Sequence, residues 1–188
     1  MCKAIPLEIL SIMENKNDRP LVSFIVTTYN LPTTLLCECL QSILSLSLSK
    51  EEREIIVVDD GSEVSPLNDL VELRDKIVYV RQRNKGLSEA RNMGLVCAQG
   101  KFIQFVDGDD YLIQAPYEHC LDIARYKDAD IILFHETEEE QPEVPFECNG
   151  PMTGSAYMHQ YNLRASACGY LFRANILGNL RFTPCLLY

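Results

Sequence analysis

Residues 102–111 read Phe102-Ile103-Gln104-Phe105-Val106-Asp107-Gly108-Asp109-Asp110-Tyr111. The apolar run predicts a buried strand, and it ends in three carboxylates grouped around a glycine. Such carboxylates repel one another and are costly at the end of a buried strand unless a positive charge lies among them. In an extended segment Asp107 and Asp109 project to the same side, where they offer oxygen ligands to one hard divalent cation, Mg²⁺ or Mn²⁺. The alternative is a solvated acidic turn, because Asp and Gly are ordinary turn residues.

Apolar, β-branched segments alternate with helical segments along the first two thirds of the chain. The early strands are nearly continuous apolar runs, which is typical of parallel strands covered on both faces. This rhythm predicts an α/β fold with a mostly parallel central sheet. Only the Leu-Ser alternation over residues 44–49 fits either a helix or a strand. The expected strands span residues 21–28, 54–58, 77–80, 101–106, 130–134 and 169–173, and the expected helices span 32–48, 65–74, 87–98, 116–126, 155–161 and 174–177.

Length and charge limit the classes of protein to which the chain can belong. The 188 residues are enough for one domain with a substantial core, and we expect a loosely attached leader over residues 1–20 before a single domain over residues 21–188. The net charge of −10 argues against non-specific nucleic-acid binding, which needs a basic surface. A phosphate-bearing ligand would therefore need a metal ion or a local cluster of Arg and Lys.

The sequence shows neither a secretory signal nor a membrane span. Residues 1–20 are mixed in character, and no uninterrupted apolar run approaches the ~18 residues that a span requires. The eight cysteines include no C-x-x-C pair and the three histidines have no zinc-finger spacing, so most cysteines are expected to be buried free thiols of a reducing cytosol. We therefore expect a cytoplasmic protein, which leaves room for peripheral association with the inner face of the membrane.

Polar motifs follow the ends of three expected strands. They are Thr28-Tyr29-Asn30, Asp59-Asp60-Gly61-Ser62 and Asp107-Gly108-Asp109-Asp110. In open parallel sheets, ligands bind beyond the carboxyl ends of the strands. Turns without a shared function have no reason to carry polar, reactive side chains at the same edge of the sheet. We therefore predict that this edge is the functional site.

Four segments occur in order between about residues 20 and 135: Val26-Thr27-Thr28-Tyr29-Asn30, Val57-Val58-Asp59-Asp60-Gly61-Ser62, Asn84-Lys85-Gly86-Leu87-Ser88-Glu89-Ala90-Arg91-Asn92-Met93-Gly94 and Phe105-Val106-Asp107-Gly108-Asp109-Asp110-Tyr111. Together they resemble the family 2 glycosyltransferases, which have the GT-A fold, a Rossmann-like three-layer α/β/α sandwich. The resemblance implies transfer of a sugar from a nucleotide-diphosphate sugar, with UDP favoured, to a glycan or lipid-linked acceptor. It further implies inversion, a Mn²⁺ or Mg²⁺ cofactor, and a place in polysaccharide or cell-surface glycan synthesis.

Candidate base-binding residues follow the first two strands. Thr27, Tyr29 and Asn30 provide hydroxyl and amide groups and an aromatic plane, which suit hydrogen bonding and stacking with a nucleotide base. The alternative for Tyr29 is packing on the core. By resemblance, Asp60 accepts a hydrogen bond from the ring N–H of a pyrimidine, while Asp59 caps or braces the loop.

Candidate phosphate- and metal-binding residues come from the last two segments. Gly86 permits close approach of the backbone to a ligand, and Arg91 adds a cation on the helix that follows. By resemblance this loop lies beside the nucleoside and pyrophosphate; the alternative for Arg91 is a surface partner on its helix, or a salt bridge with Asp59 or Asp107. The resemblance makes Asp109 the metal ligand, and Asp107 a ligand of the metal or of the ribose hydroxyls. The metal would neutralise charge on the departing nucleoside diphosphate.

The general base that inverting transfer requires is not identified in the sequence. By resemblance it is an Asp or Glu in a later motif, yet no acid follows Glu147. We therefore expect residues 21–135 to be the nucleotide-sugar-binding part and residues 136–188 to be an incomplete acceptor part, truncated before the base. We expect nucleotide-sugar binding with little or no transfer, and a catalytically incomplete binding domain stays open as the alternative to an enzyme. A sugar nucleotidyltransferase is disfavoured, because Tyr29-Asn30-Leu31-Pro32 stands where that class usually has a Gly-rich phosphate loop.

Overall fold

The computed structural model describes residues 19–135, 137, 150–163 and 165–183. Almost all of the leader expected over residues 1–20 lies outside this part of the chain. Among the described residues, no helix combines the length and the apolar character needed to cross a membrane.

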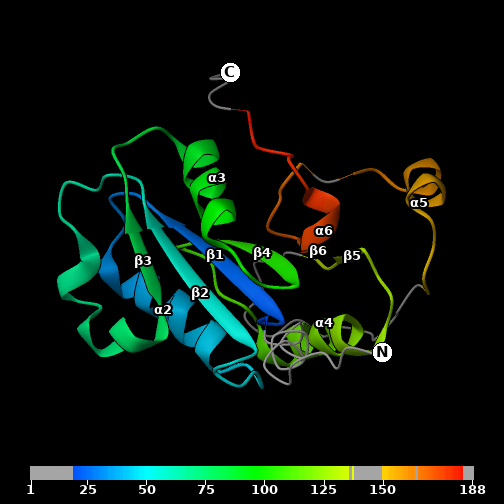
Figure 1. The fold of residues 1–188 in the computed structure, drawn as a ribbon, viewed down its shortest axis with the longest axis horizontal. Helices are drawn as coiled ribbons and strands as arrows, with labels where there is room; N and C mark the ends of the chain where they lie inside the picture. The colour runs from blue at the N-terminus through cyan, green and yellow to red at the C-terminus, as the bar shows by residue number, and fades with distance from the viewer. Residues whose placement is uncertain (1–18, 136, 138–149, 164, 184–188) are drawn as a thin grey trace, which may run out of the picture.

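The described residues form a six-stranded sheet with the order β3-β2-β1-β4-β6-β5 (Figure 1). β1 pairs in parallel with β2 on one side and with β4 on the other, and β2 pairs in parallel with β3. β6 is antiparallel to β4, and β5 is antiparallel to β6. The prediction of a mostly parallel sheet is confirmed. The strands are β1 (Val22–Thr28), β2 (Arg53–Asp59), β3 (Val78–Arg81), β4 (Phe102–Asp107), β5 (Ile131–Leu133) and β6 (Tyr170–Arg173).

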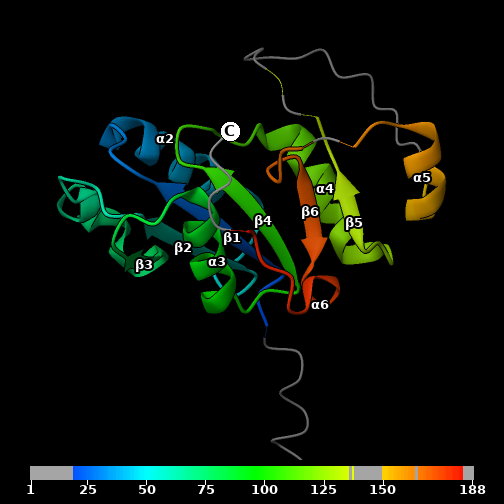
Figure 2. The same ribbon diagram turned by 90° about the horizontal axis from the view of Figure 1, so that it is seen from above.

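Helices cover both faces of the sheet and make the three layers expected from the sequence. α2 (Thr33–Leu44) and α4 (Gln114–Tyr126) lie on one face, and α3 (Leu87–Cys97) and α6 (Ala174–Leu177) lie on the other (Figures 1 and 2). α5 (Gly154–Gln160) buries none of its residues and lies beyond β5 (Figure 2). Cover on both faces explains why consecutive strand residues are apolar.

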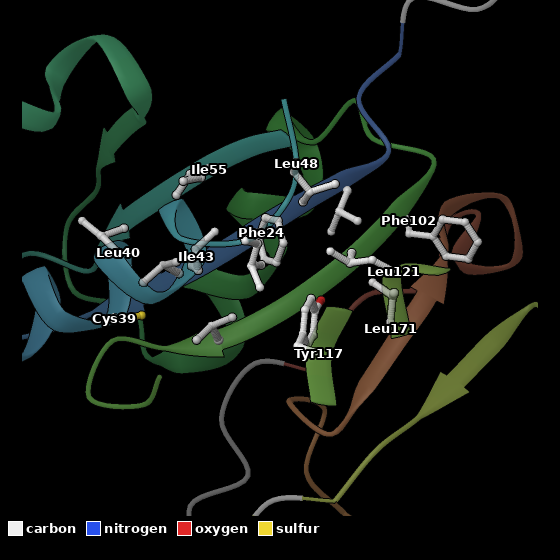
Figure 3. Packing of buried hydrophobic residues seen from close by; sticks show 14 of the residues in the cluster. Phe24, Cys39, Leu40, Ile43, Leu48, Ile55, Phe102, Tyr117, Leu121 and Leu171 are labelled. Atoms are coloured by element: carbon white, nitrogen blue, oxygen red, sulfur yellow. The ribbon is translucent and has the colours of Figure 1, made fainter. Parts of the chain in front are cut away.

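Alternate residues of β1 supply two hydrophobic cores. Phe24 belongs to the cluster shown in Figure 3, where its ring centroid lies 6.0 Å from that of Tyr117 in α4. Ile25 belongs to the opposite cluster, with Phe105 of β4 and Ala90 of α3. Because successive side chains of a strand point to opposite faces, one strand anchors helices on both sides. Burial of each large apolar side chain stabilises the fold by roughly 1.5–3 kcal/mol.

β6 lies between β4 and β5, a placement that the order of the strands along the chain does not indicate. The buried side chain of Gln104 in β4 helps to hold this region. Its Nε2 donates to the carbonyl oxygen of Cys168 at 2.7 Å, and its Oε1 accepts from the Tyr117 hydroxyl at 3.0 Å. A buried amide without partners would cost free energy, so Gln104 favours a chain path that brings Cys168 to it.

The segment expected as one helix over residues 65–74 instead forms two 3₁₀ helices, Pro66–Asn68 and Val71–Lys76. The expectation was wrong because the buried apolar positions are few. Leu70 and Leu73 are buried three residues apart, which matches the period of a 3₁₀ helix and leaves no wider apolar face to sustain an α-helix.

The first helix ends earlier than the expected residue 48. The Arg53 guanidinium donates to the carbonyl oxygen of Leu44 at 2.9 Å, which satisfies a group left open at the end of α2. The Leu-Ser alternation that follows is neither helix nor strand. Leu46 and Leu48 are instead buried as connecting residues, and the chain turns back toward β2.

The contact of α3 with β1 yields a stability prediction at Gly94. A Cβ atom there would overlap the Cγ2 atom of Ile25, which is fully buried. We expect Gly94→Ala to destabilise the protein by about 1–3 kcal/mol, because overpacking outweighs the better helix propensity of Ala. Urea denaturation measures the difference.

Gly154→Ala is the matched control, since Gly154 is also helical but a Cβ atom there meets nothing within 4 Å. The control should leave the urea midpoint unchanged or raise it slightly. Equal stability of Gly94→Ala and the wild type would contradict the close packing of α3 on β1.

Candidate functional site

Parallel pairing brings the carboxyl ends of three strands together. Thr28 of β1 is the register partner of Asp59 in β2, and Thr27 is the register partner of Asp107 in β4. Beyond the strand end, the N–H of Asp60 donates to the carbonyl oxygen of Thr28 at 2.9 Å. The three polar motifs singled out in the sequence are therefore neighbours at one edge.

Asp59 is fully buried and braces the loop after β2. Its Oδ1 accepts from the N–H of Ser62 at 2.8 Å, and its Oδ2 accepts from the Tyr79 hydroxyl at 2.7 Å and lies 3.2 Å from Nε of Arg81. Burial raises the pKa of Asp59, but the hydrogen bonds from Ser62 and Tyr79 and the charge of Arg81 outweigh burial and hold the pKa below its usual value. These contacts agree with the bracing role expected of Asp59.

Asp60 holds the loop that precedes α3. Its Oδ1 accepts from the side-chain amide of Gln82 at 2.7 Å and from the N–H of Lys85 at 3.0 Å, and its Oδ2 accepts from the N–H of Gly86 at 2.7 Å. Gly86 has a φ of 87°, which glycine adopts without strain. The pyrimidine contact of Asp60 stays a prediction, and a base would share a carboxylate that already accepts from three groups.

The residues at the end of β1 have three different environments. Thr27 is buried, and its hydroxyl donates to Oδ1 of Asp107 at 3.3 Å, so it supports the acidic motif. Asn30 accepts at Oδ1 from the N–H of Glu63 at 2.8 Å, which ties the end of β1 to the loop after β2. Tyr29 is 51% exposed, so it does not pack in the core and its ring is accessible for stacking. Contact of these residues with a base stays a prediction.

Arg91 forms an ion pair with Asp107, one of the alternatives considered from the sequence. Its Nη2 lies 2.9 Å from Oδ1 and 3.2 Å from Oδ2 of Asp107. The Cys168 thiol donates to the same Oδ2 at 3.5 Å. Burial and the charge of Asp107 raise the pKa of Cys168 to about 12, so this thiol stays protonated at neutral pH. Asp107 is thus held by Thr27, Arg91 and Cys168.

The chain turns directly after Asp107. The N–H of Gly108 donates to the carbonyl oxygen of Thr27, and the N–H of Asp110 donates to that of Asp107, each at 2.9 Å. β4 therefore ends at Asp107, and the expectation that Asp109 projects from an extended strand on the same side is wrong. Asp109 instead lies exposed on the turn.

The acidic turn offers oxygen ligands without a complete metal cage. Within the described ranges, no three His, Cys, Asp or Glu side chains gather closely enough to hold a metal ion. Asp107 is paired with Arg91, whereas Asp109 is exposed. Mg²⁺ is commonly bound by one or two carboxylates together with substrate phosphates and water, so this donor set fits a cation that binds together with a diphosphate.

A hollow of about 480 Å³ lies beside the loops held by Asp59 and Asp60. A Cβ atom on Gly61, whose φ is 81°, would lie 2.6 Å from the backbone nitrogen of Asn84, so glycine is required where these loops approach. The hollow is lined by two arginines, of which Arg81 is paired with Asp59. Its lining residues are Gly61, Arg81, Gln82, Arg83 and Asn84.

Several residues at this edge were missed by sequence reasoning. Gln82 follows β3, whose carboxyl end reaches the same edge, so the strand-end rule applied to β3 would have found it. Tyr79 and Cys168 carry no comparable signal. Cys168 reaches Asp107 only because the chain returns to form β6 beside β4.

Known proteins resemble this chain in sequence. The family model described as glycosyl transferase family 2 matches residues 23–160. The uncharacterized glycosyltransferase EpsJ of Bacillus subtilis is 36% identical over 134 residues, which are 67% of this chain and 38% of that protein. The poly(ribitol-phosphate) beta-glucosyltransferase of Bacillus spizizenii is 34% identical over 117 residues, 60% of this chain and 18% of that protein. The chain thus spans well under half of these relatives.

The fold also resembles that of a solved glycosyltransferase structure. The crystal structure of S. aureus TarS 1-349 has a TM-score of 0.68 and 26% identity, covering 83% of this chain and 48% of that chain. The same protein in complex with UDP-GlcNAc matches with the same TM-score and identity over 46% of its chain. The expected GT-A arrangement is confirmed.

The environment of Asp59 predicts a pH-dependent contribution to stability. Because the folded-state pKa lies below the usual 3.8, the contribution is fully present above that value and is lost as the pH falls through the lower folded-state pKa. At neutral pH, Asp59→Asn should cost about 2–4 kcal/mol, since Ser62, Tyr79 and Arg81 lose a charged acceptor. The difference in unfolding free energy between the wild type and the variant should narrow as the pH falls below 3.8. Urea denaturation across this pH range measures the gap.

Asp75→Asn, at an exposed position, is the matched control and should give no comparable pH-dependent gap. If the difference in unfolding free energy between wild type and Asp59→Asn stays constant as the pH falls below 3.8, the charge of Asp59 is not what stabilises the loop.

Proposed function

The chain belongs to glycosyl transferase family 2, and we propose that it binds a nucleotide-diphosphate sugar at the carboxyl edge of its sheet, for transfer of a hexosyl group. The observation that carries the proposal is the turn after β4, where Asp107 is paired with Arg91 while Asp109 stays exposed. An exposed carboxylate, next to a carboxylate whose charge an arginine already offsets, suits a divalent cation that binds together with a diphosphate.

We propose UDP as the nucleotide, which the UDP-GlcNAc complex of S. aureus TarS supports. The accessible ring of Tyr29 is the proposed stacking surface for the base, and Asp60 the proposed acceptor for its ring N–H. Thr27, Asn30 and Gly86 hold the surrounding loops through their contacts with Asp107, Glu63 and Asp60. Their proposed role is to shape the binding surface.

We propose Mn²⁺ or Mg²⁺ as the cofactor, held by Asp109 with Asp107 beside it. When bound, the cation would neutralise charge that develops on the departing nucleoside diphosphate. The guanidinium of Arg91 is engaged in the ion pair with Asp107. Because Arg91 offsets the charge of Asp107, the turn avoids the repulsion that three adjacent carboxylates would otherwise create.

The proposed acceptor is a glycan or a lipid-linked glycan in polysaccharide or cell-surface glycan synthesis, and the proposed stereochemical outcome is inversion. The relative from Bacillus spizizenii, named for a poly(ribitol-phosphate) acceptor, supports this class. We further propose that the reaction takes place in the cytoplasm, with peripheral association at the inner face of the membrane.

A second candidate function is nucleotide-sugar binding without transfer. It is favoured by the contacts of the acids at the edge: Asp59 and Asp60 accept hydrogen bonds from the loops, and Asp107 is paired with Arg91. A carboxylate engaged in this way is poorly placed to take a proton from an acceptor hydroxyl. Comparing UDP binding with sugar transfer by the same protein separates the two functions.

Calorimetry with UDP and Mn²⁺ tests the donor site. The wild type should bind UDP more tightly with Mn²⁺ than without it, because the cation screens the diphosphate from the acidic turn. Asp109→Asn should weaken binding in the presence of Mn²⁺ by at least about tenfold, since the amide is a poorer ligand for a hard cation.

Asp75→Asn is the control, because it removes one exposed carboxylate elsewhere on the surface and should leave the Kd unchanged. Absence of UDP binding by the wild type at millimolar concentration would refute the donor site. UDP binding that does not respond to Mn²⁺ or to Asp109→Asn would refute the metal assignment alone.

A further inference from the structure

The chain after α6 returns to α3, where the side chain of Asn92 binds its backbone. The Nδ2 amide of Asn92 donates to the carbonyl oxygen of Phe182 at 2.9 Å, and the N–H of Phe182 donates to Oδ1 of Asn92 at 2.8 Å. The two hydrogen bonds pair both the N–H and the carbonyl oxygen of Phe182, as the backbone of a neighbouring strand would. Asn is suited to this contact because its side chain ends in both a donor and an acceptor. Figure 2 shows the segment running from α6 toward α3.

The same contact places the ring of Phe182 against the core and against Arg91. The ring lies edge-on to Phe105, with centroids 5.1 Å apart and an interplanar angle of 89°. The guanidinium carbon of Arg91 lies 5.5 Å from the centroid of the Phe182 ring. A cation is attracted to the face of an aromatic ring, so Phe182 restrains the charged end of Arg91 as well as filling space.

Among the described residues, Arg91 has few polar contacts that define its position, although its side chain is largely buried. Only 13% of its side chain is exposed, and its buried Nε has no hydrogen-bond partner among the described residues. Its Nη2 makes the ion pair with Asp107 and also donates to the sulfur of Cys168 at 3.5 Å. A long side chain loses much rotamer freedom when it is held in one place, so it stays there only if several contacts oppose that loss. The Phe182 ring adds a further contact to the ion pair and the Cys168 sulfur.

We propose that Asn92 is a positioning residue: it fixes the backbone of Phe182, which holds the Phe182 ring against Arg91 and thereby orients the Arg91–Asp107 pair at the carboxyl edge. Asn92 acts through these neighbours and does not touch the ligand. The inference rests on the proposed donor site, because the orientation of Asp107 affects binding only if a cation and a diphosphate bind beside it.

Two measurements on the full 188-residue chain test the proposal. The NMR resonance of the Arg91 Nε–H reports the ring current of Phe182 and needs no ligand, and calorimetry reports the Kd for UDP in the presence of Mn²⁺. Asn92→Ala removes both hydrogen bonds to the backbone. Phe182→Leu removes the ring but keeps the backbone groups that Asn92 binds. Val96→Ala, on the same helix at a position 70% exposed, is the control.

Asn92→Ala should move the Arg91 resonance toward that of an ordinary arginine and raise the Kd about three- to tenfold. Phe182→Leu should raise the Kd by a similar factor. The double variant should bind UDP no more weakly than whichever single variant has the higher Kd, because the two residues act in series. Val96→Ala should change neither the resonance nor the Kd.

An Arg91 resonance that is the same in Asn92→Ala as in the wild type would overturn the proposal. Effects on the Kd that multiply in the double variant would also overturn it, since the residues would then act independently. If the wild type binds no UDP, the proposed function fails, and the resonance still decides the role of Asn92. If Asn92→Ala does not fold, an unchanged Kd in Phe182→Leu overturns the proposal.

Discussion

β1 pairs in parallel with β2 on one side and with β4 on the other, and both the fold and the site depend on these two registers. The pairings place β1 inside the sheet, where helices α2 and α4 cover one of its faces and α3 covers the other. They also make Thr27 and Asp107 register partners. A slip of one residue would turn the side chains of β1 to the opposite faces and would separate Thr27 from Asp107. The hydrogen bonds that hold the sheet therefore also place the acidic turn.

The acids at this edge differ in what offsets their charge. Asp59 is buried among donors, with Arg81 as its counterion, and Asp60 accepts hydrogen bonds from the backbone of the next loop. Asp107 is paired with Arg91, and Asp109 faces solvent. Carboxylates close together in the sequence can thus have different roles. A carboxylate that is paired with donors or a counterion braces a loop, whereas an exposed carboxylate stays accessible to a cation.

Much of the fold could be predicted from local patterns. The strands β1 to β4 could be predicted from their apolar, β-branched composition. The helices α2 and α3 could be predicted from the helical spacing of their apolar residues. The position of β6 could not be predicted, because this four-residue strand is placed by pairing with β4 and by the contact of Gln104 with Cys168, across 64 residues. The two 3₁₀ helices were missed since helix type there depends on how little apolar surface the segment buries.

By itself, the sequence determined which residue types stand at the carboxyl edge, because residues that follow parallel strands emerge at that edge whatever their later partners are. It left the partner of Arg91 open between a neighbour on its own helix, Asp59 and Asp107. Only the tertiary structure decided that Arg91 pairs with Asp107 and that Asn92 binds the backbone of Phe182. These contacts join residues 16 and 90 positions apart. Their formation depends on the path of the chain through space, which local propensity and periodicity do not specify.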